Sequence, residues 1–136
     1  MIQVIAGRKG SGKTKRLIDL TNSTAQDAAH DVIFLDDDNR YMFDVDHNVR
    51  FINANDYHIH STDMFIGFLC GILSSNFDVG TVFVDAFLKL CHTELEGTRP
   101  VVETLDELSA KHHVDFVLSL SADPSELPDF LQKYVI

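Results

Sequence analysis

The residues with the clearest chemistry form a glycine-rich loop near the start of the chain, Gly7-Arg8-Lys9-Gly10-Ser11-Gly12-Lys13-Thr14. Glycine lets the backbone curl, so that successive N–H groups point inward at phosphate oxygens. A lysine at the end of such a loop reaches the β- and γ-phosphates, and the hydroxyl that follows it suits a magnesium ion. The expected chemistry is the binding of a nucleotide's phosphates together with Mg²⁺.

This loop fits the Walker A pattern, and the segments around it agree with that interpretation. The apolar run Gln3 to Ala6 predicts a strand before the loop, and Lys13 to about Asp27 predicts a helix after it. Such a helix aims the positive end of its dipole at the anion. We therefore expect nucleotide contacts from all eight loop residues and from Lys15; a glycine loop that binds nothing is the alternative.

Asp85 closes the β-branched run Thr81 to Asp85, at the position where a Walker B aspartate holds magnesium. We expect Thr14 and Asp85 to share the metal ion, and we assign catalytic roles to Lys13 and Asp85. A turn aspartate at a strand end is the alternative. The next residue is Ala86. Many ATP hydrolases that have a Walker A loop and a Walker B aspartate carry a glutamate at this position, and it polarises the attacking water. Hydrolysis is therefore expected to be slow, or to use another carboxylate.

Other candidate side chains follow the predicted strands, and spacing does not rank them. The carboxylates that suit water activation are Asp37, Asp38, Glu94 and Glu96. The run Asp36-Asp37-Asp38 is also typical of a solvated turn. Ser119 and Ser121 suit contact with the γ-phosphate or with local backbone. Arg40, Arg50 and Arg99 suit either an arginine finger or the surface. His58 and His60 alternate on one face, with no third metal ligand suggested nearby, and His112-His113 is expected to end a helix.

The remaining pattern alternates strands with helices, which predicts a parallel sheet covered on both faces. Further strands are expected at 31–35, 50–53, 81–85 and 115–120, with helices at 64–75, 99–112 and 124–132, and an edge strand at 134–136. On the first helix, Leu17, Leu20 and Thr24 are expected to share one face, and Ser61 to Asp63 offers caps for the second. Gly67 and Gly71 predict close packing. The fold class is a single α/β domain over 1–136, with three layers and about five mainly parallel strands.

The net charge of the chain restricts the kinds of partner that it is expected to bind. Acidic residues number 21 and basic residues 11, for a net charge of −10. The average surface therefore repels nucleic acid and anionic lipid, and a phosphate site must be local. The apolar run Met64 to Leu73 is too short to span a bilayer. Cys70 and Cys91 suit a reducing compartment, and we expect a cytoplasmic protein with a nucleotide ligand.

Taken together, Gly7 to Thr14, Asp85 and the helix, strand and serine between Val101 and Ser121 resemble the RecA-like P-loop ATPases. The run Asp36-Asp37-Asp38-Asn39-Arg40-Tyr41 is similar to that of small bacterial P-loop proteins grouped with twitching-motility ATPases. The extra domain and the acidic and histidine boxes of the motors are missing, so motor function is not implied. The resemblance implies ATP as the nucleotide, and a strand order that places Asp115 to Leu120 between the strands of the loop and of Asp85.

Three functions are compatible with these residues. The first is an ATP-binding protein with slow or partner-dependent, magnesium-dependent hydrolysis. The second is a kinase for a nucleoside or small molecule, with Asp36 or Asp37 near a hydroxyl, Arg40 on the transferred group and 92–100 as a short lid. The third is a nucleotide-gated interaction module that binds a protein partner or forms a homo-oligomer, with Met64 to Leu73 partly in the interface.

Overall fold

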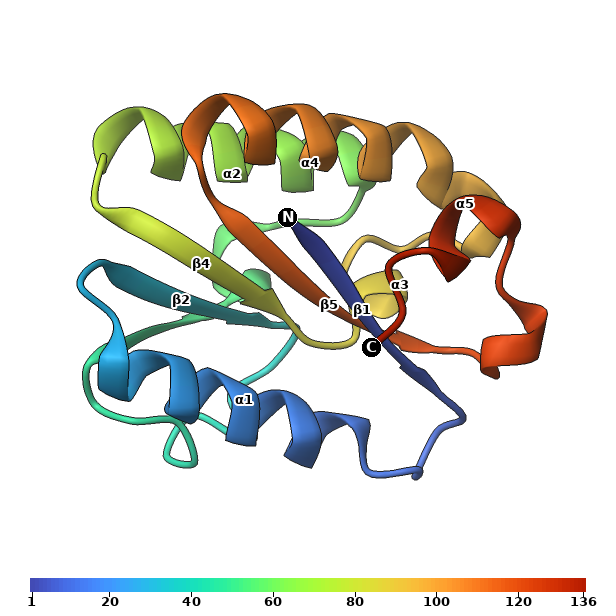
Figure 1. The fold of residues 1–136 in the computed structure, drawn as a ribbon, viewed down its shortest axis with the longest axis horizontal. Helices are drawn as coiled ribbons and strands as arrows, with labels where there is room; N and C mark the ends of the chain where they lie inside the picture. The colour runs from blue at the N-terminus through green and yellow to red at the C-terminus, as the bar shows by residue number, and fades with distance from the viewer.

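Five parallel strands form the central sheet of the computed structural model, which describes residues 1–136 (Figure 1). They are β1 (Ile2–Gly7), β2 (Asp31–Asp36), β3 (Val49–Asn53), β4 (Val79–Val84) and β5 (Asp115–Ser121). Their order across the sheet is β1-β5-β4-β2-β3, and every neighbouring pair is parallel. The expected position of β5 between β1 and β4 is confirmed.

Helices lie on both faces of this sheet (Figure 1). One face carries α1 (Lys13–Asp27), and the other carries α2 (Thr62–Ser75) and α4 (Arg99–His112). Short elements complete the chain: the helices α3 (Phe87–Leu90) and α5 (Asp129–Gln132) and the 3₁₀ turns η1 (Ala54–Tyr57), η2 (Leu95–Thr98) and η3 (Pro124–Glu126). None of the helices has both the length and the apolar character that crossing a membrane requires.

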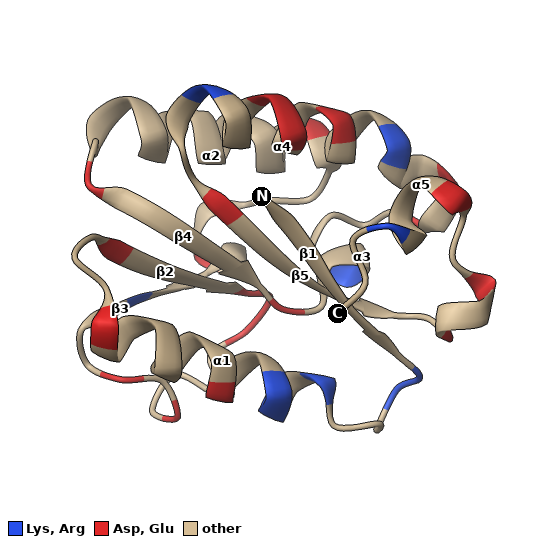
Figure 2. Cartoon of the chain, viewed as in Figure 1, with Lys and Arg blue, Asp and Glu red and all other residues tan.

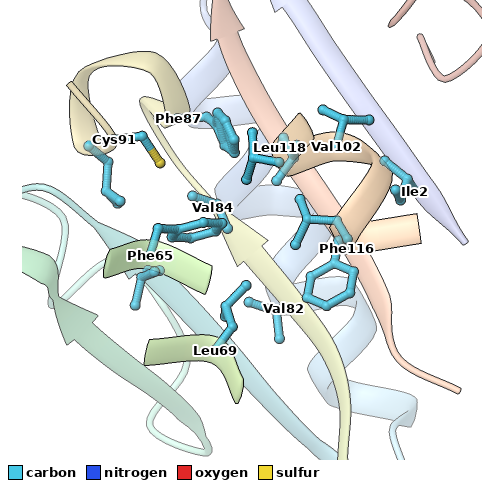
Figure 3. Packing of buried hydrophobic residues seen from close by; sticks show 14 of the residues in the cluster. Ile2, Phe65, Leu69, Val82, Val84, Phe87, Cys91, Val102, Phe116 and Leu118 are labelled. Atoms are coloured by element: carbon cyan, nitrogen blue, oxygen red, sulfur yellow. The ribbon is translucent and has the colours of Figure 1, made fainter. Parts of the chain in front are cut away.

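Two apolar clusters join the layers. The larger has 26 buried residues and lies between the sheet and the α2/α4 layer, where Phe65 of α2 meets Phe87 of α3 edge to face at 5.4 Å (Figure 3). The smaller has 10 buried residues and joins α1 to the opposite face. Because both faces are covered, the inner strands are buried almost throughout, which explains their continuous apolar sequence.

The buried face of α1 differs from the predicted one. Leu17 is buried as expected, but Leu20 and Thr24 are only half-buried, and the contact is completed by Ile18, Thr21 and Ala25. Thr21 tolerates full burial because its hydroxyl donates to the carbonyl of Leu17 at 2.7 Å. A threonine that bonds to its own helix counts as apolar for packing, which hydropathy does not capture.

The prediction of close packing at Gly67 and Gly71 is wrong. A Cβ atom added at either residue would meet nothing within 4 Å, so both glycines face open space on α2. The buried face of α2 consists instead of Phe65, Leu69 and Leu73. The predicted cap is confirmed, since the Ser61 side chain accepts a hydrogen bond from the Met64 N–H at 3.1 Å.

The C-terminal region also departs from its prediction. The expected helix over 124–132 is divided into η3 and α5, because Pro128 restricts Leu127 to an extended backbone with φ −69° and ψ 135°. The predicted edge strand over 134–136 is reduced to one parallel bridge between Val4 and Val135. The chain nevertheless returns alongside β1, so that the strand leading into the glycine loop has neighbours on both sides.

Candidate functional site

The glycine loop joins β1 to α1 and leaves the start of the helix free for a ligand. Gly10 and Gly12 have φ values of 83° and 91°, in the left-handed region that glycine adopts without strain. Gly12 is the N-cap of α1 and offers no side-chain cap. The first helical bond runs from the Arg16 N–H to the Gly12 carbonyl, so the N–H groups of the preceding turn have no helical acceptor. An anion is the natural partner for these donors.

Asp85 meets this loop from the end of β4. Its carboxylate oxygen Oδ2 accepts a hydrogen bond from the Thr14 hydroxyl at 3.0 Å. Its own N–H donates to the carbonyl of Leu35 at 2.9 Å, which fixes it against β2. Asp85 is only 4% exposed. The two residues that the sequence predicts to share a metal ion therefore lie in direct contact.

Ser119 holds the other oxygen of the same carboxylate. Its hydroxyl donates to Oδ1 of Asp85 at 2.5 Å and accepts from the Ala86 N–H at 2.8 Å. Ser119 therefore orients Asp85. Its two partners lie 33 and 34 residues away in the chain and one of them is a side chain, so these are not the contacts with local backbone that the sequence suggested as an alternative. Ser121, two residues further along β5, is exposed and lines the adjoining cleft.

Lys13 lies on the same side of the loop. Its Nζ donates to the Arg8 carbonyl at 3.1 Å, a contact within the loop itself. Burial lowers the pKa of Lys13 from its ordinary value, while the negative charge of Asp85 acts in the opposite direction. A phosphate group would replace the carbonyl as the acceptor for this ammonium group and favour its charged form.

Asp36 is buried more deeply than the two aspartates that follow it. It ends β2, beside β4, where Leu35 pairs with Val84. It is 2% exposed, and Oδ1 accepts the Asp37 N–H at 2.8 Å. Its Oδ2 is the one buried side-chain polar atom in the chain without a hydrogen-bond partner. Burial, aided by the charge of Asp85, raises the pKa of Asp36 to about 8.

The other two aspartates of the acidic run, Asp37 and Asp38, form salt bridges with solvated lysine and arginine side chains. Lys89 Nζ lies 3.1 Å from Asp37, and the Arg40 guanidinium lies 3.5 Å from Asp38. The three carboxylates Asp36 to Asp38 each offer an oxygen within 4.8 Å of the others. Because two of them are already neutralised, the run is better described as the rim of the site than as a separate cation site.

A cleft of about 1050 Å³ brings these groups together. From the loop and α1 it is lined by Lys9, Gly10, Gly12, Lys13, Thr14 and Lys15, and from the sheet by Asp36, Asp85, Ala86 and Ser119. Arg40 and Tyr41 lie on the opposite rim, and Tyr41 supplies the only aromatic ring in the cleft. The other candidates lie elsewhere: Arg50, Arg99, Glu94 and Glu96 do not line this cleft.

Lysine and arginine gather at the glycine loop and the start of α1 (Figure 2). Five of the 11 basic residues are concentrated in the glycine loop and the first turn of α1: Arg8, Lys9, Lys13, Lys15 and Arg16. The facing rim is acidic, with Asp37, Asp38 and Asp44. Arg8 is bonded to Asp123 at 3.1 Å and Lys15 to Asp19 at 2.8 Å, so both are already paired with a carboxylate. Of the basic residues that line the cleft, Lys9 and Lys13 are the two that form no salt bridge, and they are available to an anion.

Comparison with known proteins gives no significant match for this chain, either to a protein-family model or to a curated sequence.

We predict that Asp36→Asn stabilises the fold, by an amount that grows with pH. Between the unfolded value of about 3.9 and the folded value of about 8, the unfolded chain releases a proton that the folded chain keeps. Wild-type stability should fall as pH rises through that window, and asparagine removes the effect. Urea unfolding should show the difference between variant and wild type increasing by at least about 1 kcal/mol from pH 5 to pH 8.

Asp38→Asn is the matched control, because Asp38 is partly exposed and already paired with Arg40. Its stability relative to wild type should not acquire this pH dependence. A difference for Asp36→Asn that stayed constant across the same pH range would contradict the assignment of a raised pKa to Asp36.

Proposed function

We propose that this chain binds Mg²⁺-ATP in the cleft as a RecA-like P-loop protein and hydrolyses it slowly, or at a useful rate only with a partner. The observation that carries the proposal is the contact of Thr14 with Asp85 at the free start of α1. A hydroxyl and a carboxylate in contact beside unpaired backbone N–H groups are what a magnesium-bound phosphate chain requires. The concentration of basic residues around the loop supports the same conclusion.

The cleft offers a partner for each part of the ligand. The backbone of the loop and Lys13 suit the phosphates, and Thr14 with Asp85 would hold Mg²⁺, which supplies charge neutralisation when bound. Ser119 keeps Asp85 in place through Oδ1, so that Oδ2 remains directed at Thr14. Tyr41 offers a ring face to the base.

Asp36 is the carboxylate that we propose to accept the proton of the attacking water. Ala86 cannot do so, while Asp36 lines the cleft beside Asp85 and has a free oxygen. In the unliganded protein its raised pKa leaves it mostly protonated at neutral pH, and a protonated acid is not a base. Slow hydrolysis, or hydrolysis that waits for a partner to alter this environment, follows from that state.

One observation favours a kinase as the second candidate. A separate cavity of about 600 Å³ adjoins the cleft, and it includes Asn55, Thr93 and Glu94. Asp37, Leu88 and Lys89 line both spaces. A hydroxyl compound in the smaller cavity would lie across the Asp37–Lys89 pair from the phosphates, and phosphoryl transfer to it would replace transfer to water.

The first prediction from this proposal concerns Lys13. Lys13→Ala should abolish measurable binding of Mg²⁺-ATP, because the phosphates lose the ammonium group at the end of the loop. Isothermal titration calorimetry measures the effect. Lys111→Ala, at an exposed lysine near the end of α4, is the control and should bind as wild type does. Equal binding by Lys13→Ala and wild type would refute nucleotide binding at this loop.

The second prediction concerns turnover. Asp36→Asn should retain ATP binding and lose most of the hydrolysis, by about 100-fold if proton transfer to Asp36 is used. Product analysis by ion-exchange chromatography separates the candidates. ADP with free phosphate indicates hydrolysis, whereas ADP with a phosphorylated alcohol or nucleoside, formed only when that compound is added, indicates a kinase. Binding without either product indicates a nucleotide-gated module and contradicts the role of Asp36.

The third prediction concerns the base. Tyr41→Ala should weaken ATP binding by about fivefold, the equivalent of roughly 1 kcal/mol of lost aromatic contact. It should leave the affinity for inorganic triphosphate unchanged, because the loop is intact. Phe43→Ala is a matched control, since Phe43 is 90% exposed and lies outside the cleft. An equal loss of triphosphate binding would show that Tyr41 supports the loop instead of the base.

A further inference from the structure

Three histidines from two separate segments come together outside the phosphate cleft. His58 and His60 lie between η1 and α2, and His92 lies between α3 and η2. The ring centroids of His60 and His92 are 5.4 Å apart, and those of His58 and His60 are 6.3 Å apart. All three side chains are exposed. The sequence suggested no third residue beside the first two histidines, and the fold places the ring of His92 next to that of His60.

These separations are close to those of imidazoles that share one metal ion. A zinc–nitrogen bond of about 2 Å places a ring centroid roughly 3 Å from the ion. At the tetrahedral angle, two such rings have centroids about 5 Å apart. The His60–His92 pair is already at this spacing, and the His58–His60 pair is wider by about 1 Å. The ligand nitrogens of the three rings do not all lie within 4.8 Å of one another, so the rings must turn to direct nitrogens at a common point, which their exposure permits.

We propose that His58, His60 and His92 form a binding site for a transition-metal cation of the zinc type. Imidazole nitrogen suits zinc, copper and nickel, whereas magnesium requires oxygen ligands, so this site is chemically separate from Thr14 and Asp85. Three histidines leave a fourth position for water or an external ligand. The ion would tie the connection after β3 to the connection after α3.

The backbone determines which substitutions test the site cleanly. His58 and His92 have φ values of 59° and 51°, in the left-handed region that alanine adopts only with strain. Asparagine tolerates that region better, so His92→Asn removes the imidazole at small cost to the fold. His60 has no positive φ, and His60→Ala is suitable there. Circular dichroism confirms that each variant is folded.

The experiment is a titration of the full chain, without an affinity tag, with Zn²⁺ in excess Mg²⁺, which occupies the oxygen-rich cleft. Calorimetry should show one equivalent of zinc bound, and Co²⁺ in its place should give the strong visible bands of a four-coordinate site. His60→Ala and His92→Asn should each weaken zinc binding by about tenfold or more, since loss even of a ligand's supporting contacts costs that much. His112→Ala, at an exposed histidine ending α4, should bind as wild type does.

Two results would overturn the site: no stoichiometric zinc binding by wild type, or binding by His60→Ala that equals it. Binding of Mg²⁺-ATP is measured on the same samples and should be unchanged in both histidine variants. The zinc site and the nucleotide site can therefore fail independently.

Discussion

The carboxylate of Asp85 is the contact on which the rest of the site depends. It receives the Thr14 hydroxyl from α1 on one oxygen and the Ser119 hydroxyl from β5 on the other, while its backbone N–H is bonded to β2. Burying a charged group in this position is tolerable only because hydroxyl donors replace the lost water. Asp85 thus links the first turn of α1 to both β5 and β2.

Asp36, at the end of the neighbouring strand β2, is less completely hydrogen-bonded than Asp85. It is as deeply buried as Asp85, yet one of its oxygens has no partner, and its pKa is raised accordingly. Unsatisfied polar groups destabilise a fold and are rare in protein interiors. In this cleft a buried carboxyl group with both oxygens hydrogen-bonded therefore lies beside one with an oxygen left unbonded, and perturbed groups of this kind are concentrated at functional sites.

The sequence predicted the strands, the long helices and their order well, because each is marked by a local pattern: a continuous apolar run, a cap such as Ser61, or a glycine loop. It also predicted that Thr14 and Asp85 belong together, since the carboxyl ends of parallel strands meet at one edge.

Features that depend on neighbours distant in sequence could not be predicted from local sequence patterns. Nothing local distinguishes the buried Asp36 from Asp37, because burial comes from β4. The same is true of the exposure of Gly67 and Gly71 on α2. It is also true of the proximity of His92 to His60, because both depend on residues distant in sequence. The division of the C-terminal helix does have a local cause, because Pro128 restricts Leu127 to an extended backbone.

Ala86 differs from its neighbours in its backbone conformation. Its φ is 50°, and its N–H is bonded to the Ser119 hydroxyl, so the chain leaves β4 in a left-handed turn immediately after Asp85. A longer residue at this point would begin from a strained backbone and in a different direction from one that continued the strand. Acquiring a water-activating glutamate there would therefore require rebuilding the turn as well as exchanging the residue.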